Sequence, residues 1–139
     1  MSVVPYLTFN GNCREAMTHY AKIFGTELEM IMTAAEMPDF DPPPEEADKI
    51  AHCSFRVAGG EIYASDMIMG KIGPMDGFSV MVNLPDIDQA RAAYDALVDG
   101  GEVGMEFQET FWSPGFGACV DKFGTPWMIS TESAEDQQG

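Results

Sequence analysis

His52 is the first side chain whose type and setting suit proton transfer. It lies in the run Ile50–Val57, where apolar and polar residues alternate, as is typical of a strand with one buried face. His52 and Arg56 then share the face opposite the apolar side chains. Imidazole can donate or accept a proton near neutral pH, so His52 is a candidate general acid or base. The alternative is a structural histidine held by hydrogen bonds.

Glu109 is the second candidate for proton transfer. It occupies an alternating row of the run 102–111 whose other members are apolar, and desolvation in such a row favours a carboxyl group that takes up a proton. The alternative is a glutamate at a strand end that reaches solvent. Phe111 and Trp112 follow and could form the mouth of a pocket, although strict alternation lets both face inward only if a bulge intervenes.

Asp66 and Cys13 have two interpretations each. Asp66 follows a predicted strand at 61–65 and is either a turn cap or a ligand-binding residue. Cys13 lies in the first turn of a predicted helix, where the helix dipole favours a thiolate, but no base is near it in the sequence. We therefore interpret Cys13 as a buried core residue.

The elements that must position these side chains occur twice along the chain. One series at about 3–66 and another at about 78–131 each contain a strand, a helix and three further strands. Asn12 and Asp86 are expected helix N-caps, with Glu15 and Gln89 as the partners of capping boxes, and the two caps lie 74 residues apart. Near the ends of the series the offset is 65, because the first series contains an acidic, proline-rich loop at 36–49. The predicted strands are 3–9, 27–33, 50–57, 61–65, 78–84, 102–111, 117–120 and 127–131.

This order predicts an α+β fold in which two βαβββ modules form curved mixed sheets around a pocket. We expect one domain over residues 1–139, with a polar tail at 132–139. The 65-residue offset pairs Tyr63 with Met128, so both should face the cavity, together with Phe78, Leu7 and Phe9.

Charge and composition exclude several classes of function. The chain has 23 acidic and 7 basic residues, a net charge of −16, which disfavours binding to nucleic acids and to anionic membranes. No apolar run approaches the roughly 18 residues of a membrane span, and the N-terminus lacks the pattern of a signal peptide. Three cysteines, an odd number without metal-site spacing, indicate reduced thiols and a cytoplasmic location.

Several motifs together resemble the PhnB-like branch of the vicinal oxygen chelate superfamily, which includes glyoxalases, bleomycin-resistance proteins and dioxygenases. The resemblance covers about residues 3–131 and implies a homodimer of paired modules with a small-molecule pocket. Members of the branch sometimes carry a methyltransferase label, but the sequence has no Gly-rich turn for such a cofactor. The motifs are Pro5-Tyr6-Leu7-x-Phe9-x-Gly11-Asn12-Cys13, Ala16-x-x-x-Tyr20, Ile50-Ala51-His52, Ser65-Asp66, Gln108-Glu109-Thr110-Phe111-Trp112, Gly115-Phe116-Gly117 and Asp121-x-Phe123-Gly124-x-Pro126-Trp127.

The resemblance also implies where a metal would bind. Metal-using members take four ligands from the first and last strands of the two modules, and these positions fall on Pro5, Tyr63, Phe78 and Met128. Pro and Phe have no donor atom, a thioether is too soft for such a site, and a tyrosine must first lose its proton. We therefore expect neither a metal at this site nor a cofactor. An unrelated metal site with His52 and Asp66 or Glu109 is the alternative.

The sequence therefore favours a PhnB-like protein that binds a small organic ligand in a largely apolar pocket, without the usual metal. Two alternatives stay open: a metal-dependent enzyme of the glyoxalase or dioxygenase type with relocated ligands, and a non-catalytic protein that sequesters a drug or ligand. If the protein is an enzyme, we expect proton transfer by His52 or Glu109. The expected ligand contacts are Tyr63, Phe78, Met128, Trp112, Phe111, Arg56 and Asp66.

Overall fold

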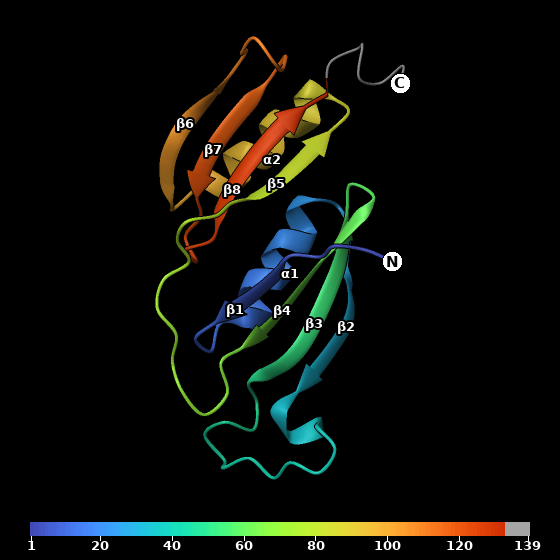
Figure 1. Cartoon of the computed structure of the whole chain (residues 1–139), viewed down its shortest axis with the longest axis vertical. Helices are drawn as coiled ribbons and strands as arrows, with labels where there is room; N and C mark the ends of the chain where they lie inside the picture. Colours follow the sequence, from blue (N-terminus) through green and yellow to red (C-terminus); the bar gives the residue numbers. More distant parts are fainter. Residues whose placement is uncertain (133–139) are drawn as a thin grey trace. The chain divides into compact units, whose positions relative to one another are not determined.

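A computed structural model of the chain describes residues 1–132. The chain divides into two compact units, Met1–Gly73 and a second one that begins at Pro74. Each contains one βαβββ series, as predicted (Figure 1). The elements of the first unit are β1 (Tyr6–Phe9), α1 (Cys13–Ile23), β2 (Leu28–Thr33), β3 (Ile50–Val57) and β4 (Gly60–Asp66), with a short 3-10 turn at Ala34–Glu36 after β2. Those of the second are β5 (Val80–Leu84), α2 (Ile87–Val98), β6 (Glu102–Gln108), β7 (Phe116–Val120) and β8 (Pro126–Thr131).

The two sheets have the same topology. Their strand orders are β1-β4-β3-β2 and β5-β8-β7-β6, and in each sheet the first and last strands of the series are paired in parallel. Tyr6 pairs with Tyr63 in the first sheet and Met81 with Met128 in the second. The pairing confirms the 65-residue offset between β4 and β8, and it sets an offset of 75 between β1 and β5.

The core of the first unit lies between α1 and one face of its sheet (Figure 1). Met17 and Tyr20 are buried on the helix side, as the spacing of apolar residues predicts. Leu7 and Phe9 face them, and the rings of Phe9 and Tyr20 lie 6.5 Å apart. The expectation that Leu7 and Phe9 line a cavity is therefore wrong, because alternation turns them toward the helix and leaves Tyr6 on the opposite face.

In the second unit α2 packs closely on its sheet through Tyr94. The Tyr94 hydroxyl donates a hydrogen bond to the Met105 carbonyl at 2.9 Å, and a Cβ atom at Gly117 would lie only 2.8 Å from the Tyr94 ring. Glycine at position 117 thus allows the close approach of helix and strand. Trp127 is fully buried, as expected for a core residue, and its indole N–H donates to Asp121 at 2.8 Å.

The two helices begin in different ways. Asp86 caps α2 as predicted, because its carboxylate accepts the Asp88 N–H at 2.9 Å. Asn12 occupies the N-cap position of α1 as predicted, but its side chain makes no capping bond. The buried carboxylate of Asp66, at the end of β4, accepts the N–H groups of Gly11 and Cys13 at 2.9 Å instead. A residue from a distant strand therefore performs the function of the cap of α1.

In the part of the chain that the structure describes, neither helix is long or apolar enough to span a bilayer. The predicted tail at 132–139 lies almost entirely outside the described residues.

Candidate functional site

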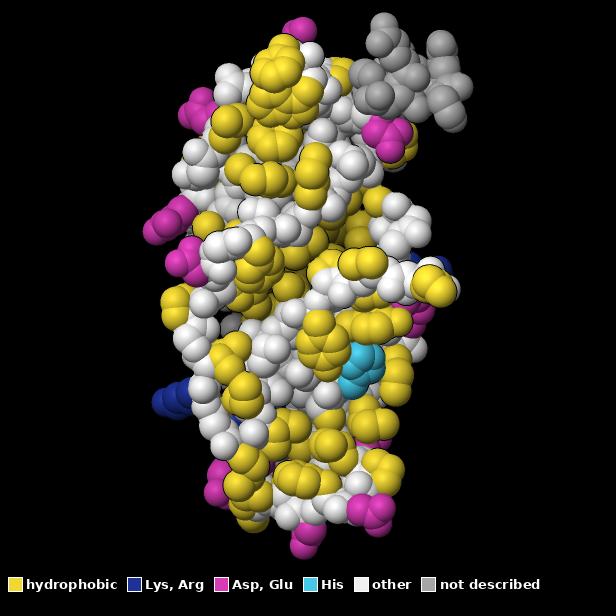
Figure 2. Space-filling model, in the orientation of Figure 1, with side chains coloured by type: hydrophobic (Ala, Val, Ile, Leu, Met, Phe, Trp, Pro, Cys, Tyr) yellow, Lys and Arg dark blue, Asp and Glu magenta, His cyan; other side chains and the backbone are white. Residues whose placement is uncertain are grey.

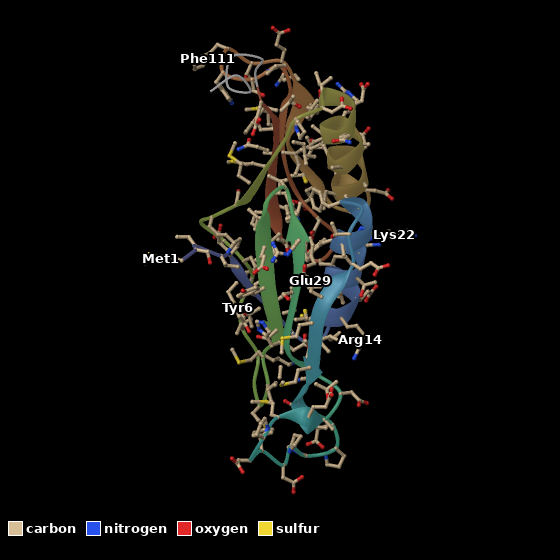
Figure 3. The ribbon with its side chains drawn as sticks, turned by 90° about the vertical axis from the view of Figure 1, so that its right-hand side faces the viewer. Met1, Tyr6, Arg14, Lys22, Glu29 and Phe111 are labelled. Carbon is tan, nitrogen blue, oxygen red and sulfur yellow. The ribbon has the colours of Figure 1, made fainter. Side chains whose placement is uncertain are left out.

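The face of the first sheet opposite α1, here called the first open face, carries an aromatic cluster. Three strands contribute to it: Tyr6 from β1, His52 from β3 and Tyr63 from β4. The Tyr6 hydroxyl lies 3.2 Å from His52 Nδ1, and the His52 ring lies 5.1 Å from the ring of Tyr63 in an edge-to-face arrangement. Figure 3 shows Tyr6 on the side of the sheet away from Lys22 of α1.

His52 therefore lies where alternation predicts, half-buried on the open face. Its Nδ1 is engaged by Tyr6, and no hydrogen bond to Nε2 is recorded within residues 1–132. Figure 2 shows hydrophobic side chains gathered around a histidine over the strands of the first unit. The arrangement gives an imidazole whose orientation is fixed by one nitrogen while the other can meet a ligand.

A charged network borders this cluster. The Tyr63 hydroxyl donates to the Glu61 carboxylate at 2.8 Å, and this bond, with the negative charge of Glu61, raises the pKa of Tyr63. Arg56 pairs with Glu61 at 3.2 Å and with Glu29 at 2.8 Å. Arg56 was predicted on this face and lies there, but both Glu61 and Glu29 already engage its guanidinium group.

Asp66 lies on the other side of the same sheet. Besides the two bonds at the start of α1, its second oxygen accepts the Ile50 N–H at 2.8 Å. Alternation along β4 puts Asp66 with Ile62 and Ala64 toward the helix, and away from Tyr63. The geometry therefore gives Asp66 a structural function that neither interpretation named, the cap of α1, and it does not bring Asp66 to the face that carries His52. The alternative metal site that combined these two residues loses its basis.

The corresponding face of the second sheet, the second open face, is mostly apolar. Met81 and Met128 are paired there, and Ala118 of β7 lies beside Met128. A shallow depression of about 300 Å³ lies at the end of this face, lined by Met81, Asn83, Trp112, Ser130, Thr131 and Glu132. Met128 thus lies on the second open face, and its predicted contact with a ligand stays a prediction.

Four other predicted residues lie at the edges of the second unit. Strand β6 ends at Gln108 after two irregularities in its pairing, so Glu109 leaves the alternating row and is exposed. Phe111 is 97% exposed and stacks edge to face on Trp112, with ring centres 4.7 Å apart. Phe78 precedes β5 and is 47% exposed. Of these, only Trp112 lines the depression.

The residues at the ligand positions of the fold do not fit a metal ion. Strand pairing moves the first-strand positions from Pro5 and Phe78 to Tyr6 and Met81, beside Tyr63 and Met128. The phenols of the first unit and the thioethers of the second both lack the imidazole and carboxylate donors that such ions prefer, and Glu61 disfavours the phenolate of Tyr63. Within residues 1–132 no group of three or more His, Cys, Asp or Glu side chains is placed to hold a metal.

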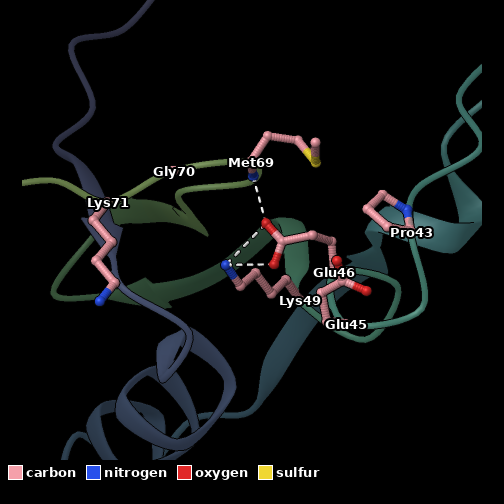
Figure 4. A pocket seen from close by; sticks show the side chains of 7 residues that line it. All are labelled: Pro43, Glu45, Glu46, Lys49, Met69, Gly70 and Lys71. Carbon is pink, nitrogen blue, oxygen red and sulfur yellow. Dashed lines mark hydrogen bonds and ion pairs between the residues drawn. The ribbon is translucent and has the colours of Figure 1, made fainter.

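The first unit has a depression of its own, of about 380 Å³, where the loop at 36–49 meets the linker after β4 (Figure 4). The buried carboxylate of Glu46 accepts the Met69 N–H and pairs with Lys49 at 2.7 Å. Lys49 also donates to the Met67 carbonyl at 3.3 Å. These contacts join the loop to the linker, and we assign them a structural function.

Sequence reasoning did not identify two members of the first open face, Tyr6 and Glu61. Tyr6 stands in a run of apolar residues that hides the phase of β1, but it directly precedes the buried Leu7. Glu61 follows the turn at Gly59 and pairs with Arg56 across the hairpin. A hairpin register drawn from that turn would have placed Glu61 beside Arg56.

Comparison with solved structures defines the class of protein. A protein from Pseudomonas aeruginosa, PA1353, is 35% identical with a TM-score of 0.87, and the match covers 95% of this chain and 98% of that one. A PhnB protein from Bacillus cereus is 21% identical with a TM-score of 0.74, over 94% and 99% of the two chains. The fold is that of the glyoxalase, bleomycin-resistance and dioxygenase superfamily.

The family follows from sequence comparison. Residues 1–130 match the family described as 3-demethylubiquinone-9 3-methyltransferase. Protein YjdN of Escherichia coli K12 is 33% identical over 147 aligned residues, which cover 99% of this chain and all of that protein. The chain therefore belongs to this PhnB-like family of the vicinal oxygen chelate superfamily.

Proposed function

We propose that the protein binds a small, partly apolar organic ligand on the first open face. One observation supports this most: Tyr6, His52 and Tyr63 come from three strands and form a cluster in which Tyr6 is 51% exposed. Aromatic faces bind apolar or planar parts of a ligand, while the imidazole and the phenols offer hydrogen bonds. The match to the methyltransferase family supports membership only, and we do not propose that activity.

Retention of small molecules from a cell extract tests this proposal. The purified protein is incubated with a low-molecular-weight extract, separated by gel filtration, and the bound compounds are identified by mass spectrometry. We expect compounds that the native chain and a Lys22→Ala control retain, but a Tyr6→Ala/Tyr63→Ala variant does not, because Lys22 lies on the helix side (Figure 3). Equal retention by all three proteins would contradict the proposal. A parallel Met128→Ala variant measures whether the second open face contributes.

Proton transfer by His52 is a second candidate function, favoured by the Tyr6 hydroxyl at 3.2 Å from Nδ1. If Tyr6 donates to Nδ1, Nε2 carries the proton and can donate a hydrogen bond to a ligand; in the other tautomer Nε2 has a free lone pair and can act as a base. A retained compound that is recovered chemically changed, with the change lost in His52→Gln, supports catalysis. Recovery unchanged supports sequestration. Glu109, in the second unit, stays a prediction for the same function.

The metal-dependent alternative is tested separately. Elemental analysis of protein purified without chelators should give no stoichiometric Zn, Ni, Mn or Fe, because neither the phenols of Tyr6 and Tyr63 in the first unit nor the thioethers of Met81 and Met128 in the second suit such ions. One ion per chain, with activity lost on chelation, would favour relocated ligands.

A further inference from the structure

Cys13 and Cys53 form a close pair of thiols in the core of the first unit. Cys13 lies in the first turn of α1 and Cys53 in the middle of β3, 40 residues away in the sequence. Their Sγ atoms are 3.5 Å apart, and neither residue is exposed to solvent. The odd cysteine count of the sequence predicted reduced thiols and gave no sign of this pairing.

We propose that Cys13 and Cys53 are a redox pair that forms a disulfide within the first unit. The two sulfur atoms must approach by about 1.5 Å to reach the bond length of roughly 2.05 Å, a shift that side-chain rotation and a small movement of the helix can supply. The pair lies on two elements that already pack against each other, so no change of fold is required. This inference does not depend on the ligand proposed above.

The environment of the two thiols distinguishes their chemical functions. Either sulfur can donate the hydrogen bond that joins the two thiols at 3.5 Å, and this bond lowers the pKa of Cys53 while it raises that of Cys13. We assign the attack to Cys53, because the Cys13 thiol lies 3.5 Å away and can donate a hydrogen bond to a thiolate there. The Cys53 thiolate attacks hydrogen peroxide, the O–O bond breaks, and a sulfenic acid and water are formed. The Cys13 sulfur then displaces the sulfenic oxygen, which leaves as a second water with the Cys13 proton, so the two thiols lose two electrons to one peroxide.

The second unit has the same order of elements but no thiol pair at the equivalent positions. Strand pairing and the helix offset make Ile87 and Gly117 the counterparts of Cys13 and Cys53. Gly117 lies against the Tyr94 ring, where a side chain would not fit. Cys119 is buried with no thiol partner recorded in the described residues, and burial raises its pKa to about 11. A thiol pair is thus specific to the first unit and is not a requirement of the fold.

A disulfide would join α1 to the strand that carries His52. The Cys13 N–H is also one of the donors to Asp66, so the cross-link and the cap of α1 meet at one residue. Because both thiols are buried, oxidation must follow local opening of the first helical turn and should take place slowly.

Mass spectrometry of the full chain tests the proposal. A Cys119→Ser variant leaves only the pair, and treatment with hydrogen peroxide should remove two hydrogen atoms, about 2 Da, from a monomeric chain. The change should be reversed by dithiothreitol, and peptide mapping should join the peptides of Cys13 and Cys53. The matched control, Cys53→Ser/Cys119→Ser, should not lose the two hydrogens.

Thermal unfolding provides a second readout, since a cross-link that closes a 40-residue loop should raise Tm by several degrees in the oxidised Cys119→Ser variant. The proposal is overturned if the folded variant keeps both thiols after prolonged exposure to peroxide, or if the lost hydrogens are found only in dimers linked between chains. Circular dichroism confirms that each variant is folded before treatment.

Discussion

The two units share their order of elements but hold their helices in different ways. Helix α1 begins against Asp66, a buried carboxylate from β4 that accepts three backbone N–H groups. Helix α2 begins at its own Asp86, which is exposed. The counterpart of Asp66 under the 65-residue offset is Thr131, whose hydroxyl is buried and has no partner recorded within residues 1–132. In the first unit one carboxylate on β4 thus binds the start of α1 and the start of β3. In the second unit the helix start has only a local cap and apolar packing.

The open faces differ in a corresponding way. The first carries Tyr6, His52 and Tyr63 with a charged border, and the second carries mainly Met81, Met128 and Ala118. Duplicated modules can therefore differ in chemistry: the cluster of Tyr6, His52 and Tyr63 lies in the first unit, while Asn83 and Ser130 line the depression of the second. The second contributes adaptable apolar surface, for which methionine is well suited.

The largest expected effect comes from removing the charge at the centre of the first unit. Asp66→Asn keeps one carbonyl oxygen but directs an amide group at the Ile50 N–H, which leaves buried donors unpaired. We expect the free energy of unfolding to fall by about 3 kcal/mol, since bonds to a charged acceptor are the strong ones. Urea denaturation followed by circular dichroism measures the loss. A loss no larger than that of Asp86→Asn would show that the two helix starts do not differ in energy.

The local cap of the second unit should matter less. Asp86→Ala removes the bond to the Asp88 N–H at the exposed start of α2, and we expect a loss of about 1 kcal/mol, the usual cost of deleting an N-cap. Urea denaturation again gives the value. Asp86→Ser, which restores a capping oxygen, is the control and should recover most of the stability. A loss equal to that of Asp66→Asn would contradict the comparison.

The difference between the two caps also shows what the sequence could reveal. Capping rules consider residues within one turn of the helix start, and there they identified Asp86 correctly. They selected Asn12 for the same reason, but Asp66 is 53 residues from Cys13 and comes close only when β4 pairs with β1. The order of the elements, the 65-residue offset between β4 and β8, and the sheet face on which His52 lies all depend on local residue patterns. All three could therefore be predicted.

The site was harder to predict because it depends on strand phase. In β1 the neighbours of Tyr6 are apolar as well, so its phase became clear only from the packing of Leu7. In β6 the irregular pairing after Val103 and after Met105 shifts the later residues, and Glu109 leaves the row that a strict period of two assigns to it. Gly104, at the first irregularity, is the kind of residue that often marks a bulge inside a strand, whereas the second irregularity, between Met105 and Gln108, contains no glycine or proline.

The Thr131 hydroxyl, which is buried and has no partner among residues 1–132, offers a smaller effect of opposite sign. Thr131→Val keeps the shape of the side chain and removes a buried oxygen that has no recorded partner, so we expect a gain of up to about 1 kcal/mol in the free energy of unfolding. Thermal and urea denaturation should agree in sign. Ser130→Ala is the contrasting variant and should lose stability, because the Ser130 hydroxyl lies 3.2 Å from that of Ser113. Destabilisation by Thr131→Val would mean that the hydroxyl has a partner after all.

The smallest effect concerns the border of the first open face. The Glu61 carboxylate accepts a hydrogen bond from the Tyr63 hydroxyl and raises the pKa of Tyr63, so Glu61→Gln should lower that pKa toward the ordinary value near 10. A group whose pKa is raised on folding stabilises the protein fully below its unfolded pKa, and this stabilisation is lost as pH rises through the folded pKa. The native chain should therefore lose this stabilisation only in alkaline solution, and Glu61→Gln should show less of that loss.

NMR of ¹³C-labelled tyrosine follows each ring separately, and Tyr94, whose pKa is raised mainly by burial in the second unit, should not respond to the substitution. A shift at Tyr94 equal to that at Tyr63 would show that the substitution acts through the whole protein and not through this hydrogen bond.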